Sequence, residues 1–386
     1  MGSILVISGS IVKWNLHKRI ALGIVRSVGS HPAYIIFGFS VGTGVISMFM
    51  SNTTATAMML PIALALITQL ELDHTSGFCK ALILSIPFSA SIGGIGTLIG
   101  GATNVTGVGI IKEMAGIDIT FYDWLKIGVP FVVVLLPVLA LYLTKYFRIK
   151  QEESMDMAVV NEEYEGLGPM SKGEKLTAIT FGIIIVLLIT RTWWKSYIPN
   201  IGDETVTMLG CLIMCVIPVD WKKGEFLLDS KTALANFSLP TVMLIGGSLA
   251  LGNAMSASGV TAWIADGLDF MSVLPPIALV ILMSLLAAII TEFCTNMVVV
   301  AAFLPMLYAM SNQLNMNPLL LMVSVTVAAS FAFMLPSGTP PTAIAYSTGK
   351  IELTDLIKCG FGFKIVCCLL FTVIFYGVTI GIMGLV

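Results

Sequence analysis

The chain has 386 residues, of which 57% are hydrophobic and only 11% are charged. A soluble domain carries about 25% charged residues, so this composition excludes a soluble protein and predicts an all-α polytopic membrane protein. The formal net charge of −2 gives no reason to expect a nucleic-acid partner. Neither a metal-ligand spacing nor a nucleophile–base pair of the kind an enzyme needs is evident. We expect the chain to lie in a bacterial inner membrane.

The predicted elements fall into two halves joined by a linker. Residues 1–150 make up the first half, which contains a hairpin at 32–70, a broken helix at 81–114 and a helix at 124–147. An acidic linker follows at 151–174, and its Gly and Pro content predicts a flexible cytoplasmic connection. The second half, 175–386, contains helices within 175–258, a hairpin at 272–311, a broken helix at 318–349 and a last helix at 360–386.

Lysine and arginine set the expected orientation. They gather in four groups, and the positive-inside rule places such groups in the cytoplasm. The groups are Lys13 to Arg26, Lys145 to Lys150, Lys222 to Lys231, and Lys350 with Lys358 and Lys364. Neither residue type occurs between Lys231 and Lys350, so we expect the loops of that stretch to face outside.

The segment from Pro32 to Leu70 carries no charge, yet it is interrupted by the polar run Ser51-Asn52-Thr53. Each arm would have fewer than the ~20 residues that a full crossing needs. We therefore expect a re-entrant hairpin, whose broken tip is tolerated only inside protein or beside a watery cavity.

The same pattern recurs in the second half. The stretch SNTTATAMMLP at 51–61 aligns without gaps to TNMVVVAAFLP at 295–305. A stretch broken by glycine or proline follows each, SIGGIGTLIGGATN at 91–104 and SFAFMLPSGTPPT at 330–342. Paired interrupted segments are typical of inverted-repeat transporters. The first half has less chain ahead of its hairpin, by roughly three crossing helices, so we expect the chain to lack the first few N-terminal helices.

Broken helices offer binding groups at the bilayer midplane. The N-terminus of a half-helix attracts anions. The C-terminus of the other half-helix exposes carbonyl oxygens, which suit a small cation. Ser, Thr and Asn add uncharged donors and oxygen ligands. A single Ser or Thr more often bonds its own helix or a neighbouring one. Only the repeated constellation therefore indicates a site.

At these residues the sequence resembles the divalent anion:sodium symporter family of di- and tricarboxylate carriers. Ser51-Asn52-Thr53 matches the first tip motif of that family, and Thr295-Asn296-Met297 resembles the second. The stretches ASIGGIGTLIGGATN and AFMLPSGTPPTAI resemble its two unwound segments, and KWNLHKRIAL at 13–22 resembles its amphipathic arm helix. The resemblance implies an elevator-type homodimer, in which hairpins and broken helices slide against scaffold helices within 175–258.

The resemblance also implies site residues. Those expected to contact the carboxylate substrate are Ser51, Asn52, Thr53, Gly101, Thr295, Asn296, Thr339 and Pro340. One sodium site would use Ser47, Ser51, Asn52 and Gly100, and the other Thr291, Asn296 and Gly338. Met297 replaces the threonine of the second motif, and Thr342 stands where the family often has asparagine.

The implied function is sodium-coupled transport of C4-dicarboxylates such as succinate, malate or fumarate, with no organic cofactor. Alternatives are a sodium-independent exchanger, a citrate or sulfate carrier, or a truncated membrane protein without transport activity. Glu292 is the one charge in the second hairpin. An intramembrane carboxylate indicates function by default, here proton coupling. The competing reading is a structural carboxylate bonded to backbone amides or lying in a watery crevice.

Overall fold

The structure is a computed structural model that describes residues 2–73, 76–149, 155–194, 197–198, 201–236 and 274–382, with a few single residues between 243 and 260. Most of the described chain is helical, and one two-stranded antiparallel sheet pairs β1 (Pro218–Asp220) with β2 (Glu225–Phe226). The expected helix over residues 239–257 lies almost wholly outside the described residues. The start of the second hairpin, at 272–273, also lies outside them.

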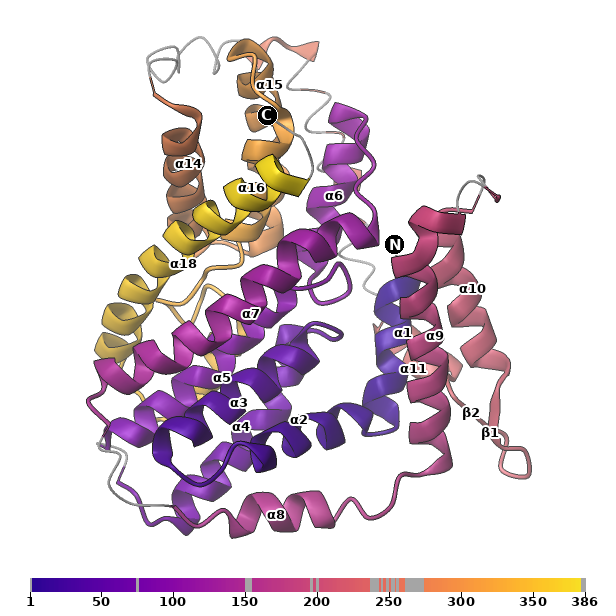
Figure 1. Cartoon of the computed structure of the whole chain (residues 1–386), viewed down its shortest axis with the longest axis vertical. Coiled ribbons are helices and arrows are strands. Elements are labelled where there is room, and N and C mark those ends of the chain that lie inside the picture. The colour runs from indigo at the N-terminus through magenta and orange to yellow at the C-terminus, as the bar shows by residue number, and fades with distance from the viewer. Residues whose placement is uncertain are drawn as a thin grey trace.

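The first half contains seven helices in the described residues (Figure 1). In chain order they are α1 (Gly2–Lys13), α2 (Leu16–Ser27), α3 (Pro32–Ser47), α4 (Asn52–Gln69), α5 (Gly77–Ile95), α6 (Ala102–Ala115) and α7 (Phe121–Tyr146). The hairpin of α3 and α4 breaks at the polar run, and α5 and α6 are separated by the glycine-rich stretch. A Cβ at Gly93 of α5 would collide with the backbone of Gly44 in α3. Glycine at 93 thus lets the hairpin lie against the broken helix at backbone contact.

The remaining helices follow the linker. They are α8 (Ala158–Glu165), α9 (Lys172–Trp194), α10 (Asp203–Val216), α11 (Ser230–Asn236), α14 (Pro276–Ile290), α15 (Asn296–Gln313), α16 (Pro318–Ala328), α17 (Pro340–Ser347) and α18 (Leu353–Ile382). The second hairpin, α14 with α15, breaks just before Asn296, and the second broken helix is unwound between α16 and α17. The last helix begins at Leu353, earlier than the expected start at 360.

The prediction that 151–174 is a flexible linker is wrong for its second part. Residues 158–165 form α8, which lies against α2 and α4 along one end of the molecule (Figure 1). Val160 is fully buried, and Lys18 of α2 pairs with Glu163 at 2.7 Å. Arg19 reaches further, to Glu174 at the start of α9, at 2.9 Å. The Gly and Pro content did not reveal these pairs, which hold the segment along the arm.

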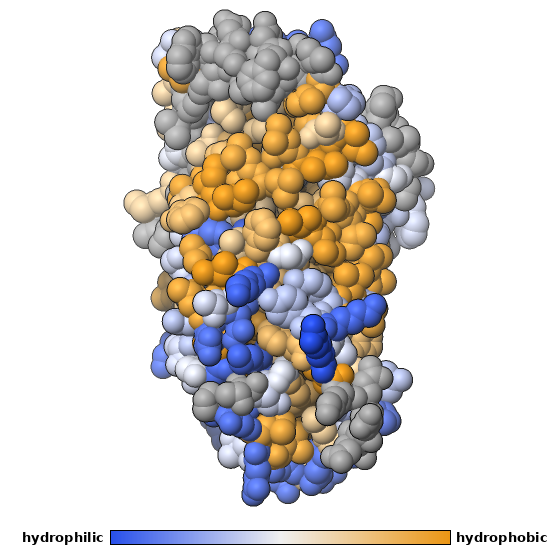
Figure 2. Space-filling model, turned by 90° about the vertical axis from the view of Figure 1, so that its left-hand side faces the viewer, coloured by the Kyte–Doolittle hydropathy of each residue, from blue (hydrophilic) through white to orange (hydrophobic). Residues whose placement is uncertain are grey.

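Four described helices are long and apolar enough to cross a membrane, namely α5, α7, α9 and α18. Exposed apolar side chains such as Val133 of α7, Leu286 of α14 and Val373 of α18 face outward. Figure 2 shows a broad hydrophobic band across one side of the molecule with a hydrophilic end below it. A surface of this kind suits lipid contact, and together with the composition it supports a mostly helical, multi-pass membrane protein.

The two halves interlock around the broken helices. Helix α4 of the first hairpin contacts α17, and α15 of the second hairpin contacts α6. Helix α1 is tied to the segment before α11, where Lys13 pairs with Asp229 at 2.6 Å and Trp14 donates to the Leu227 carbonyl at 3.0 Å. The Lys13 ammonium lowers the pKa of Asp229 to about 2, so the Asp229 carboxylate stays charged at neutral pH. These contacts place α1 and α11 beside the hairpin tips.

Candidate substrate and cation site

Four helix N-termini meet at one cavity of about 510 Å³. The first two residues of each helix line it: Asn52 and Thr53 of α4, Ala102 and Thr103 of α6, Asn296 and Met297 of α15, and Pro340 and Pro341 of α17. Helix N-termini carry partial positive charge. The starts of α4, α6 and α15 also leave backbone N–H groups unpaired, whereas α17 begins with two prolines, which have no N–H. Four such N-termini around one space favour an anion.

The first hairpin tip is organised by side-chain oxygens. Ser51 is the N-cap of α4 and accepts a hydrogen bond from the Thr54 backbone N–H at 3.2 Å. Behind it, the Ser47 Oγ lies 2.8 Å from Asn52 Oδ1 and 2.7 Å from the Ala90 carbonyl oxygen. The tip thus joins the hairpin to α5 through a cluster of three oxygens.

The second tip has the same arrangement. Thr291 Oγ1 lies 2.7 Å from Asn296 Oδ1 and 2.8 Å from the Ala329 carbonyl oxygen. Thr291 and Asn296 are the residues that the ungapped alignment pairs with Ser47 and Asn52. The cluster therefore recurs at matching positions of the two hairpins.

Each cluster suits a small cation. A hydroxyl has a single proton, so it donates to only one of its two oxygen neighbours at a time. The other oxygen is left facing a lone pair at hydrogen-bonding distance. Hydroxyl, amide and carbonyl oxygens are the ligands that hard cations prefer, and a sodium ion would neutralise this excess of acceptors. Sodium here would be transported cargo.

Further polar groups hold the first unwound stretch, and the sequence analysis did not single them out. Thr97 donates to the Met48 carbonyl and accepts from the backbone N–H groups of Ile99 and Gly100 at 3.1 and 3.2 Å. Asn104 Nδ2 donates to the carbonyls of Gly94 and Thr97 at 2.8 and 2.9 Å. The position of Asn104 in the quoted motif was a usable signal, since an amide can bridge two carbonyls that leave a helix.

The structure brings most of the expected residues together. Those that line the cavity are Ser51, Asn52, Thr53, Gly100, Gly101, Asn296, Thr339 and Pro340. Ser47 and Thr291 lie behind the tips, where they contact the two asparagines. Thr295 is exposed and is not among the residues lining the cavity, and Gly338 lies against Glu292.

The far wall of the cavity comes from outside the hairpins and broken helices. Ser8 and Val12 of α1 and Ala235 of α11 line it. No motif marked these residues, because their place depends on how α1 and α11 pack. None of the described residues that line the cavity carries a charged side chain. An anion there would be held by N–H groups, hydroxyls, helix dipoles and any bound cation.

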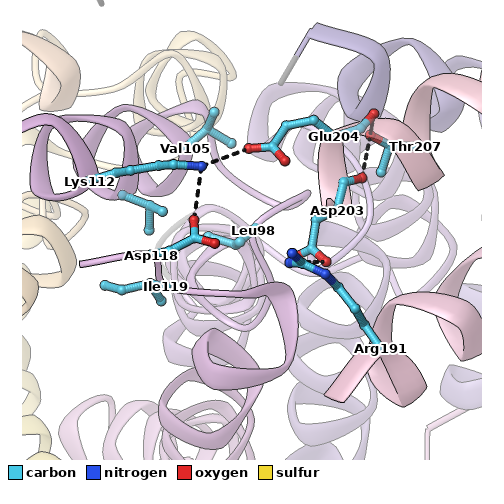
Figure 3. Close-up of a pocket in the computed structure, with 10 residues that line it drawn as sticks. Leu98, Val105, Lys112, Asp118, Ile119, Arg191, Asp203, Glu204 and Thr207 are labelled. Atoms are coloured by element: carbon cyan, nitrogen blue, oxygen red, sulfur yellow. Dashed lines mark hydrogen bonds and ion pairs between the residues drawn. The ribbon is translucent and has the colours of Figure 1, made fainter. Parts of the chain in front are cut away.

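A second, smaller pocket of about 50 Å³ lies between α6, α9 and α10 (Figure 3). Lys112 points toward Asp118 and Glu204, at 3.0 and 3.5 Å, and Arg191 pairs with Asp203 at 3.0 Å. These charges are already paired with one another. The Lys112 pairs are also well exposed, and such pairs contribute little to stability. We therefore assign the binding site to the larger cavity.

Glu292 lies just behind the second tip and is buried. Its carboxylate accepts hydrogen bonds from the backbone N–H groups of Phe333, Met334 and Leu335 and pairs with Lys364 at 2.5 Å. This agrees with the reading of Glu292 as a carboxylate bonded to backbone amides. The expectation that Lys364 belongs to a loop is wrong, because Lys364 lies inside α18 with only 1% of its side chain exposed.

Comparisons with known proteins identify the family of the chain. The sequence profile of the sodium:sulfate symporter transmembrane region matches residues 2–383. The chain is similar to the sodium-dependent dicarboxylate transporter SdcS of Staphylococcus saprophyticus, at 33% identity over 396 residues covering 98% of this chain and 76% of that protein. SdcS of Staphylococcus aureus strain USA300 is 32% identical over 398 residues with the same coverage. The crystal structure of the Alcanivorax borkumensis YdaH transporter has a TM-score of 0.60 and 14% identity, and the match covers 100% of this chain and 85% of the YdaH chain. At this identity the match shows a likeness of fold alone.

Proposed function

Because this chain belongs to the sodium:sulfate symporter transmembrane family, whose profile spans nearly all of it, we propose that it is a secondary active transporter. Its cargo is a C4-dicarboxylate such as succinate, malate or fumarate, moved together with sodium across a bacterial inner membrane. The observation that carries the proposal is the cavity between four helix N-termini, flanked by two matching clusters of three oxygens. The SdcS relatives are named as sodium-dependent dicarboxylate transporters.

The binding step follows from the charges in the cavity. A dicarboxylate gains hydrogen bonds from Asn52, Thr53 and Asn296 and from the backbone N–H groups at the starts of α4, α6 and α15. Bound sodium at the two oxygen clusters adds positive charge beside the anion, so each ligand raises the affinity for the other. Because none of the described side chains that line the cavity is cationic, the site loses affinity when sodium leaves, and the substrate is released.

The transport step rests on the pairing of the two halves. We propose that they are inverted repeats, with residues 1–150 as the first, 151–174 as the connection and 175–386 as the second. The matching tips at Asn52 and Asn296 support this division. Hairpins and broken helices then move as one body against a scaffold that includes α9, α10 and α11, in an elevator motion within a homodimer embedded in lipid. Ala235 of α11 lines the cavity together with both hairpin tips, which supports this division.

Uptake into proteoliposomes tests the function. Radiolabelled succinate is expected to accumulate when sodium is high outside, and not when potassium replaces it. Accumulation that is independent of sodium but requires dicarboxylate inside the vesicles would identify the protein as an exchanger. Met297 is the observation that favours this second candidate, because a methionine lines the cavity at the second tip, where the first tip has Thr53.

Replacement of Met297 by threonine is expected to strengthen sodium dependence. The new hydroxyl adds one oxygen ligand beside Asn296, and a hydrogen bond to a charged group is worth roughly 1.5–3 kcal/mol. The sodium concentration for half-maximal uptake should fall by about tenfold or more. The matched control is Met306→Thr on the same helix, which lies outside the residues lining the cavity. An unchanged sodium dependence would show that Met297 does not weaken the second cation site.

A further inference from the structure

The second unwound stretch, residues 330–338, is held by a buried charge, whereas the first is held by neutral groups. In the first half, the hydroxyl of Thr97 and the amide of Asn104 bond the stretch. The alignment of the two tips pairs Glu292 with Met48, an apolar residue. The two half-sites are therefore built from different chemistry, although their oxygen clusters match.

The carboxylate of Glu292 collects three successive backbone donors. Oε1 lies 2.9 Å from the Phe333 nitrogen and 3.0 Å from the Met334 nitrogen, and Oε2 lies 2.9 Å from the Leu335 nitrogen. Successive N–H groups that converge on one anion form a concave binding site. Charge-assisted bonds of this kind are roughly twice as strong as neutral ones. They fix residues 333–335, which lie between the backbone turn bonds of Phe331 to Ala328 and of Gly338 to Leu335.

Lys364 of α18 keeps that carboxylate in place. Its ammonium lies 2.5 Å from Glu292 Oε1 and 2.6 Å from the Ala288 carbonyl oxygen of α14. The exposed fractions of the two side chains are 1% for Lys364 and 2% for Glu292. Removing one member of a buried pair leaves the other uncompensated, so each residue depends on the other.

The fixed stretch connects the two parts of the second half-site. Immediately before it, the Ala329 carbonyl oxygen belongs to the cluster with Thr291. Immediately after it, Thr339 lines the cavity as the N-cap of α17. Thr342 is the third residue of α17, as Asn104 is of α6. Its hydroxyl bonds only to Thr339, at 2.8 Å, so it does not replace the amide clamp of the first half.

We propose that Glu292, held by Lys364, is a positioning residue for the second cation site. It sets the sodium affinity of that site by fixing residues 330–338, without contacting the ion. The proposal rests on the proposed function, because it assumes that the oxygen cluster at Thr291 binds sodium. It assigns to Glu292 a role in geometry and not in proton transfer.

The test measures sodium affinity in the purified chain through the rise in its thermal unfolding temperature as sodium replaces potassium. E292Q and K364M are each expected to raise the half-saturating sodium concentration by at least about tenfold. K358M removes an exposed lysine from the same helix and should match the unaltered chain. An E292Q protein whose half-saturating concentration stays within about twofold of the unaltered chain would overturn the proposal.

A charge-swapped variant separates positioning from simple helix pairing. E292K/K364E keeps one positive and one negative buried charge, but a lysine at 292 cannot accept hydrogen bonds from the three N–H groups. We expect the unfolding temperature in potassium to recover relative to E292Q, while the sodium affinity stays low. Recovery of both would mean that the pair only joins helices, and would contradict the proposal.

A milder variant serves if the charge changes prevent folding. Ser337 donates to the backbone carbonyl of Glu292 at 3.3 Å, so S337A loosens the same stretch while keeping both charges. It should raise the half-saturating sodium concentration by about two- to fivefold, and no change would count against the proposal. If the unaltered chain itself shows no response to sodium, the proposed function fails, whereas a response shared equally by all variants overturns only the role of Glu292.

Discussion

An Asn52→Ala protein is expected to lose at least about tenfold in apparent affinity for both succinate and sodium. Asn52 lines the cavity at the start of α4, and its Oδ1 belongs to the first three-oxygen cluster. The substitution removes a substrate donor and a cation ligand together. Each bond to a charged partner is worth roughly 1.5–3 kcal/mol. Initial rates of uptake at varied succinate and varied sodium measure both affinities.

The matched control for this substitution is Asn312→Ala. Asn312 is exposed in the last turn of α15, outside the residues that line the cavity. It should transport like the unaltered chain, within about twofold. Uptake by Asn52→Ala that equals the control at low succinate and low sodium would show that the site has been placed wrongly.

Gly94→Ala is expected to damage the same site without contacting the substrate. A Cβ at Gly94 would collide with the side-chain amide of Asn52. That amide is the free end of a side chain, so it can move aside, and a helix interior favours Ala over Gly by roughly 0.5–1 kcal/mol. We therefore expect a folded protein of near-normal thermal stability, in which Asn52 has left Ser47 and the sodium affinity has fallen by about tenfold or more.

Gly182→Ala is the control for that change. Gly182 lies in α9, and nothing lies within 4 Å of the Cβ that would be added there. The same substitution should leave sodium affinity unchanged and raise stability slightly. The unfolding temperature and the sodium titration of the two variants are measured side by side. A Gly94→Ala protein with normal sodium affinity would mean that the Ser47 and Asn52 pairing does not make a cation site.

The hairpin tips could be predicted from the sequence because their physical requirements are local. A polar, uncharged run such as Ser51 to Thr53 inside an apolar segment indicates a break, and a broken tip is tolerated only inside protein or beside water. The ungapped alignment to 295–305 then located the second tip. These signals depend on a few adjacent residues, and the structure places helix starts at Asn52 and Asn296.

The parts that the sequence did not reveal depend on long-range packing. Ser8, Val12 and Ala235 reach the cavity only because α1 and α11 are brought there by contacts such as the Lys13 and Asp229 pair. No periodicity or motif within either helix distinguishes such residues from other helix-facing ones.

Lys364 was misplaced for a related reason. A lysine near the end of an apolar segment is usually a loop residue, because burying a charge in a membrane is expensive. Here Glu292, distant in the sequence, offsets that cost. The pairing partner of a buried charge cannot be identified from its own neighbourhood in the chain.

The most direct measurement of the central claim is equilibrium binding of radiolabelled succinate to the purified chain, in sodium and in potassium. The cavity between four helix N-termini, with cation clusters beside it, predicts saturable binding in sodium that weakens by at least about tenfold when potassium replaces it. Equal succinate affinity in the two salts would contradict the claim that bound sodium completes the anion site.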